Sequence, residues 1–182
     1  MGPRPTERRS SAHSTPFSRR SRSGARSVAP EGRAGSRTSL AAPEKVLLDT
    51  NIYVDWLRRD LRPELVMGRG SLRYLSAVVE MELRAGAHTR SGRRALERAV
   101  HGYMAAARIV PPTTGIFADA GEVLRRLRAS GRDVRRASLV HDVLIALTAR
   151  TIGATLVTAD AGDFEAIRAL RRFSLQVVPG AA

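Results

Sequence analysis

Cysteine is absent from this sequence of 182 residues. The chain therefore forms no disulfide, offers no thiolate to zinc and has no thiol nucleophile. Long apolar runs are missing too, since no stretch approaches the roughly 18 to 20 apolar residues that a membrane-spanning helix needs. The pair Arg19-Arg20 is not followed by an apolar segment, so a twin-arginine secretory signal is not indicated. We expect a cytoplasmic protein with no membrane partner.

Lysine is nearly absent, although the chain is strongly basic. Of 31 basic residues only Lys45 is a lysine, and 17 acidic residues leave a net charge of +14. Arginine binds phosphate through a two-pronged guanidinium group and stacks on bases, so this excess favours a nucleic-acid partner. A genome rich in arginine codons would explain the ratio of arginine to lysine, but not the net charge.

Residues 1–43 differ in composition from the rest of the chain. They contain nine arginines, nine serines and only two glutamates, and apolar periodicity is absent. Such a segment buries too little apolar surface to offset its ordering entropy, so we expect it to be disordered. Two interpretations stay open: an arm that binds phosphates without sequence preference, or a start codon assigned too far upstream.

From residue 44 onward, apolar strands alternate with amphipathic helices. This alternation predicts an α/β fold, a sandwich around a mostly parallel sheet, over residues 44–182. The predicted strands cover 45–48, 72–75, 109–110, 154–158 and 175–178. The predicted helices cover 52–58, 63–68, 77–87, 91–106, 114–129, 139–151 and 163–170.

Local signals also predict helix caps and a buried face. Thr50 or Asn51 is the expected N-cap of the first helix, and Ser76 that of the helix 77–87. The helix 91–106 is expected to bury a stripe, which consists of Ala95, Ala99, Val100 and Tyr103.

Four carboxylates stand at strand ends or inside apolar helices. Asp49 follows the strand 45–48 and Asp160 follows the strand 154–158, whereas Glu82 and Asp142 lie within predicted helices. Ordinary roles exist for three of them: Asp160 as a turn residue, Glu82 as a solvated surface residue and Asp142 as a helix-start residue. For Asp163, three positions after Asp160, an N-cap is the ordinary role. Asp49 alone is better explained by a functional role.

Taken together, the four acids predict a metal site. If they converge, their charges cannot all persist without raised pKa values or bound cations. Oxygen-only ligands suit Mg²⁺ or Mn²⁺. Two such ions about 4 Å apart can activate water and stabilise the leaving oxygen in phosphodiester cleavage.

Other catalytic classes are poorly supported. The four histidines, His13, His88, His101 and His141, show no i, i+4 pair, and only His141, beside Asp142, is a candidate for proton transfer. Neither a dinucleotide-binding glycine motif nor a phosphate loop is present. A haloacid-dehalogenase-type phosphatase would carry a second aspartate where this chain has Asn51.

The sequence resembles the PIN-domain proteins of the VapC toxin type from residue 45 to about residue 179. The motifs that carry the resemblance are Leu47-Leu48-Asp49-Thr50-Asn51, Ser76-Ala77 with Glu82-Leu83 and Gly86, Asp142-Val143-Leu144-Ile145-Ala146, Gly153-Ala154-Thr155-Leu156-Val157-Thr158-Ala159-Asp160 and Asp163-Phe164. The basic arm does not belong to this pattern.

The resemblance implies a PIN-like three-layer α/β/α sandwich and a Mg²⁺- or Mn²⁺-dependent ribonuclease. It also implies a homodimer that a small antitoxin protein inhibits. The implied metal ligands are Asp49, Glu82, Asp142 and Asp160, with Asp163 as an alternative to Asp160 and Glu80 as a competitor of Glu82. The residues implied to orient ligands or water are Thr50, Asn51 and Thr158.

Two further points stay open at this stage. Arginines that hold the RNA strand are sought near the acids, at Arg84, Arg135 and Arg136, although charge runs are usually solvated faces. A PIN-like domain without activity that binds RNA or a partner is the alternative function.

Overall fold

The computed structural model describes residues 42–180, so the predicted disordered arm over 1–43 lies almost wholly outside the described residues. Within 42–180, five strands form one sheet in the order β3-β2-β1-β4-β5, and every neighbouring pair is parallel. The strands are β1 (Glu44–Leu48), β2 (Ser71–Ser76), β3 (Ile109–Val110), β4 (Thr155–Thr158) and β5 (Leu175–Val177). The prediction of an α/β sandwich around a parallel sheet is confirmed.

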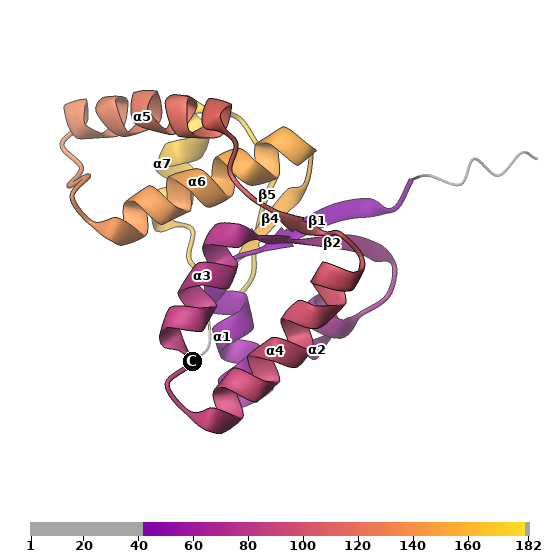
Figure 1. Ribbon diagram of the computed structural model, residues 1–182. Helices are drawn as coiled ribbons and strands as arrows, with labels where there is room; N and C mark the ends of the chain where they lie inside the picture. The colour runs from indigo at the N-terminus through magenta and orange to yellow at the C-terminus, as the bar shows by residue number, and fades with distance from the viewer. Residues whose placement is uncertain (1–41, 181–182) are drawn as a thin grey trace, which may run out of the picture. The chain divides into compact units, whose positions relative to one another are not determined.

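Seven helices of the described region connect the strands. They are α1 (Thr50–Arg59), α2 (Pro63–Met67), α3 (Ala77–Gly86), α4 (Arg90–Ala105), α5 (Thr114–Ala129), α6 (Ala137–Ile152) and α7 (Gly162–Leu170). Figure 1 shows α1 to α4 gathered on one side of the sheet and α5 to α7 on the other. Right-handed crossovers produce this division, because the chain moves one way from β1 to β3 and then returns to β4 and β5.

The central strands are β1 and β4, and both end in fully buried residues. Leu48 pairs with Val157 in register, and both side chains are buried. Continuous apolar strands of this kind are typical of parallel sheets that helices cover on both faces. The chain adds β2 and β3 on one side of β1 and then β4 and β5 on the other side. The order in which strands are added therefore reverses between β1 and β4. Open α/β sheets bind ligands at the carboxyl ends of strands at such a point.

The longest apolar surface belongs to α6, the helix that carries Asp142. Its residues from Val143 to Ala149 are all buried, which explains why its sequence shows a continuous apolar run instead of a stripe. The helix ends at Gly153, whose φ of 66° lies in the left-handed region that glycine adopts without strain.

Two local predictions need correction. The N-cap of α1 is Asp49, not Thr50 or Asn51, because the helix begins directly after the last residue of β1. The buried face of α4 contains Leu96 with Val100 and Tyr103, whereas Ala95 and Ala99 are only partly buried. Ser76 caps α3 as predicted. Within 42–180, none of the helices combines the length and apolar character needed to cross a membrane.

Candidate active site

Asp49 occupies the carboxyl end of β1 and is only 6% exposed. Its backbone N–H donates to the carbonyl of Val157 at 2.9 Å, which ties it to β4. One carboxylate oxygen accepts a hydrogen bond from the backbone N–H of Thr50 at 2.7 Å, as an N-cap does. The other accepts from the hydroxyl of Thr158 at 2.8 Å. Both oxygens are therefore fixed by the ends of two adjacent strands.

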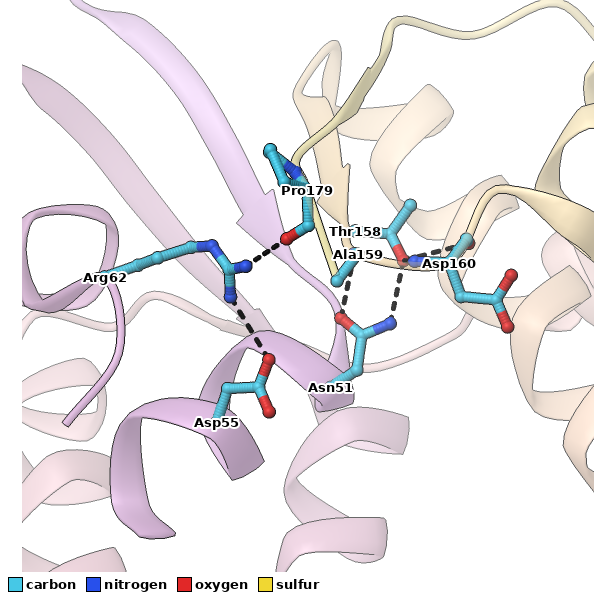
Figure 2. A network of polar contacts seen from close by, with 7 residues as sticks. All are labelled: Asn51, Asp55, Arg62, Thr158, Ala159, Asp160 and Pro179. Carbon is cyan, nitrogen blue, oxygen red and sulfur yellow. Dashed lines mark hydrogen bonds and ion pairs between the residues drawn. The ribbon is translucent and has the colours of Figure 1, made fainter. Parts of the chain in front are cut away.

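Thr158 is fully buried and joins the β1 end to the loop after β4. Its hydroxyl oxygen accepts from the side-chain amide of Asn51 at 2.9 Å and from the backbone N–H of Asp160 at 3.0 Å. The amide oxygen of Asn51 accepts in turn from the N–H of Ala159 at 3.2 Å. Figure 2 shows the Asn51 side chain pointing from α1 at this loop. The network therefore fixes the backbone that carries Asp160.

Figure 2 also shows a second link between α1 and the chain that follows β5. Arg62 donates to a carboxylate oxygen of Asp55 at 3.1 Å and to the backbone carbonyl of Pro179. This ion pair lies beside the site without including its acids, so its role is to hold α1 in place.

Glu82 is held by two other elements. The hydroxyl of Thr50, on α1, donates to one of its carboxylate oxygens. The Nδ1 atom of His141, on α6, lies 2.7 Å from the other. The neighbouring Glu80 pairs instead with Arg84 one turn along the same helix, at 2.7 Å. The geometry thus favours Glu82 over Glu80 as the site residue of α3.

Burial and mutual repulsion perturb two of the acids. Removal from water, together with the charges of Glu82 and Asp160, raises the pKa of Asp49 to about 6, although hydrogen bonds from Thr158 and Thr50 lower it. Removal from water also raises the pKa of Asp142 to about 7, and among the neighbouring charges those of Asp49 and Asp163 raise it most. The four predicted acids therefore share one electrostatic environment.

Asp160 and Asp163 are distinguished by their partners. Asp160 is exposed, and its carboxylate accepts from the backbone N–H of Gly162 at 3.0 Å. Asp163 forms ion pairs with Arg132 at 2.5 Å and with Arg136 at 2.8 Å. It lies in the first turn of α7 and is not the N-cap, because that position is occupied by Ala161. Asp163 is thus already neutralised by two guanidinium groups, whereas Asp160 is not.

The donor chemistry fits a hard divalent cation, although the carboxylates are not drawn together. In the described part of the chain, no three His, Asp or Glu side chains lie close enough to hold one ion. Burial is the main cause of the raised pKa values of Asp49 and Asp142, and the charges of neighbouring acids add to it, so a bound cation would lower the cost of ionising both carboxyls. The oxygen-only donors are of the kind that Mg²⁺ and Mn²⁺ prefer.

Sequence reasoning proposed the acids of the candidate site but missed two of their contacts. The contact of His141 with Glu82 joins residues 59 positions apart, and the pairing of Arg132 with Asp163 joins residues 31 positions apart. No local pattern signals such pairs. The position of His141 directly before Asp142 was the only hint.

The fold and the candidate site together define a class of α/β protein with a parallel sheet and acids at the carboxyl ends of its two central strands. The family follows from the sequence, because residues 46–170 match the model of the PIN domain. The chain therefore belongs to the PIN-domain family, as its motifs predicted. No curated protein matches the sequence.

Solved structures with the same fold come from toxin–antitoxin complexes. FitAcB from Neisseria gonorrhoeae is 28% identical, with a TM-score of 0.55, and the match covers 71% of this chain and 95% of that one. VapBC2 from Rickettsia felis, bound to a DNA fragment from its promoter, is 22% identical, with a TM-score of 0.56 and coverage of 74% and 98%. DNA-bound VapBC from Salmonella typhimurium is also 22% identical, with a TM-score of 0.55 and coverage of 74% and 98%.

Proposed function

We propose that this protein is a Mg²⁺- or Mn²⁺-dependent endoribonuclease and the toxin of a toxin–antitoxin pair. The observation that carries the proposal is the coupling of two acids, the buried Asp49 at the carboxyl end of β1 and the partly buried Asp142 on α6, whose pKa values burial and the neighbouring acids raise to about 6 and about 7. Acids perturbed by burial and by each other mark functional sites more often than structural ones. PIN domains are generally nucleases, and the net charge of +14 suits a polyanionic substrate.

In the proposed reaction water attacks a phosphorus atom of RNA and the bond to the leaving oxygen breaks. Asp49, Glu82, Asp142 and Asp160 would hold the cation, which when bound supplies positive charge to the attacked phosphate. Thr158 fixes the carboxylate of Asp49 by a hydrogen bond from its hydroxyl. Such supporting hydrogen bonds commonly decide how well a ligand is oriented.

Glu82 is oriented by contacts to both of its oxygens. The hydroxyl of Thr50 contacts one oxygen and the ring of His141 the other, and each carboxylate oxygen keeps a further lone pair. The Glu82 carboxylate is therefore restrained without losing its capacity to bind an ion.

The proposed partner is a small antitoxin protein, because the similar structures are the VapBC and FitAB complexes. A homodimer in the cytoplasm is the further expectation that the family resemblance adds. One finding favours a second candidate function: within residues 42–180 the acids are not gathered around a single point. A PIN domain that binds RNA or a protein without cleaving RNA would have no need to gather them.

The deciding experiment compares RNA cleavage by the full chain with and without Mn²⁺ or Mg²⁺. Glu82→Gln is the test variant and Glu80→Gln its matched control, since both residues lie on α3 and only Glu82 contacts the network. Metal-dependent cleavage that Glu82→Gln abolishes and Glu80→Gln retains would support the proposal. Absence of both Mn²⁺ binding and cleavage in the wild-type protein would refute it and leave the binding domain.

A further inference from the structure

A basic cavity lies between α1, α2 and α4, away from the acidic cluster. It has a volume of about 900 Å³, and five arginines and one carboxylate, that of Asp60, contribute to its lining. The arginines are Arg58, Arg59, Arg73, Arg98 and Arg108. Cavities of this size accommodate a substantial ligand, and the excess of guanidinium groups indicates an anionic one.

These arginines lack carboxylate partners. Among the described residues, none of the five forms an ion pair with Asp or Glu, whereas the three arginines expected from the sequence to hold RNA all do. Arg84 pairs with Glu80, Arg135 with Asp133 and Arg136 with Asp163. The cavity therefore gathers guanidinium groups without a carboxylate partner, although that of Arg73 donates to the Ser71 hydroxyl and to the carbonyl of Gly68.

Arg108 shows that unused capacity at one atom. Its guanidinium carbon lies 5.9 Å from the centre of the Tyr103 ring, an arrangement that holds the group over an aromatic face. Its Nε atom is buried and has no hydrogen-bond partner among the residues of 42–180. Buried donors are nearly always paired in folded proteins, which makes this guanidinium exceptional among the described residues.

A second hollow lies beside this cavity and is lined by one acid of the candidate site. Its volume is about 480 Å³, it lies between α1, α3 and α4, and Glu82 is part of its lining. Both hollows share Leu57, Arg58 and Ala95, so they adjoin. Only the wall formed by these shared residues separates the basic cavity from the hollow that contains Glu82.

We propose that the basic cavity holds the sugar-phosphate backbone of single-stranded RNA several nucleotides away from the scissile bond. The inference rests on the proposed function, because it takes RNA as the substrate. Guanidinium groups bind phosphates in a bidentate manner, and the apolar wall formed by Trp56, Val66 and Met67 offers a surface to bases. An acidic peptide is the rival occupant, but it would not need a guanidinium cluster in line with Glu82.

The test uses the full chain with Arg58→Gln and Arg98→Gln together, since both residues are exposed and their loss leaves the core intact. The matched control is Arg125→Gln with Arg168→Gln, which removes the same charge from arginines that are exposed and paired on α5 and α7. Binding of fluorescent oligouridylates of about 4 and about 16 nucleotides is measured by anisotropy in EDTA over a range of salt concentrations.

We expect the cavity variant to bind the longer oligonucleotide about tenfold or more weakly at low salt. Its salt dependence should be shallower by about 1.4 in log–log slope, for two lost phosphate contacts. Binding of the shorter oligonucleotide should change less, and the control should stay near the wild type. Metal-dependent cleavage should show a raised KM with an unchanged kcat.

Equal losses in the cavity and control variants would overturn the inference, because net charge alone would then explain binding. Unchanged RNA binding would overturn it too, and loss of binding only to an acidic peptide would assign the cavity to a protein. Failure of the proposed function gives a different result. If the wild-type protein binds RNA without cleaving it, and the cavity variant binds RNA more weakly, the ribonuclease proposal is refuted and the inference about the cavity stands.

Discussion

Replacing Asp49 by Asn should stabilise the metal-free protein at neutral pH. The Asp49 carboxylate is 6% exposed, and its charge is opposed by burial and by the neighbouring acids Glu82 and Asp160. Asparagine keeps the size of the side chain and removes the charge. Its amide can still accept one of the two hydrogen bonds that Thr158 and the backbone N–H of Thr50 now donate.

The size of the effect follows from the pKa of Asp49, which is about 6 in the folded protein and 3.8 in an exposed chain. The folded state holds the proton more tightly, so the free energy of unfolding falls as the pH rises from about 3.8 to about 6 and stays low above that range. The difference corresponds to about 3 kcal/mol. Loss of one hydrogen bond in the variant costs about 1 kcal/mol, which leaves a gain of about 2 kcal/mol above pH 7.

Thermal unfolding in EDTA from pH 4 to pH 8 measures this gain. Asp49→Asn should raise the melting temperature by roughly 4–8 °C at pH 8 and lower it slightly at pH 4, where the wild-type carboxyl is protonated in the folded state and the lost hydrogen bond outweighs the remaining electrostatic gain. Asp133→Asn, at an exposed ion pair with Arg135, is the control and should stay within about 0.5 kcal/mol at both pH values. An equal loss of stability by Asp49→Asn at pH 4 and pH 8 would refute the electrostatic reasoning.

Three further substitutions test the surroundings of the site. Thr158→Val removes the hydroxyl that lowers the pKa of Asp49, so carboxyl NMR titration should place that pKa above 6 and melts should show a loss of about 1–3 kcal/mol. His141→Ala should weaken Mn²⁺ binding about 10- to 100-fold, because the Glu82 carboxylate loses the contact that orients it. His141→Asn keeps a donor near the position of Nδ1 and should bind Mn²⁺ more like the wild type. Equal binding by all three proteins would contradict this role of His141. Gly153→Ala meets open space but a φ of 66°, so denaturant titration should show a loss of about 1–2 kcal/mol.

The fold was predictable because its signals are local. Buried parallel strands appear as short apolar runs, and Gly153 or Ser76 marks a helix end whatever the distant packing is. One error, the N-cap of α1, was local, because the helix begins directly after β1; the other occurred where distant packing decides. The face that α4 turns to the core contains Leu96, because the orientation of a helix depends on what it packs against and not on its own spacing alone.

The proximity of the two strand-end acids was predictable for a similar reason, whereas the partners of the candidate site residues were not. The carboxyl ends of neighbouring parallel strands meet at one edge, so Asp49 and Asp160 had to lie near each other once β1 and β4 paired. The distinction between Asp160 and Asp163 depends on Arg132 and Arg136, which approach from the loop before α6. Such a contact has no signature in the sequence around either aspartate.

The two charged sites should respond to ligands separately. Repulsion among the acids disfavours the metal-free fold near neutral pH, and unpaired arginines around the cavity carry a similar cost without an anion. A ligand that binds only the folded state raises its stability, by about 2.7 kcal/mol at a hundred times its dissociation constant. Mn²⁺ should therefore raise the melting temperature of the wild type but not of Asp49→Asn. Oligouridylate in EDTA should also raise the melting temperature of the wild type. That rise should be equally large in Asp49→Asn and smaller in the double variant Arg58→Gln with Arg98→Gln. Were one substitution to abolish both responses, the cavity and the acids would form a single site.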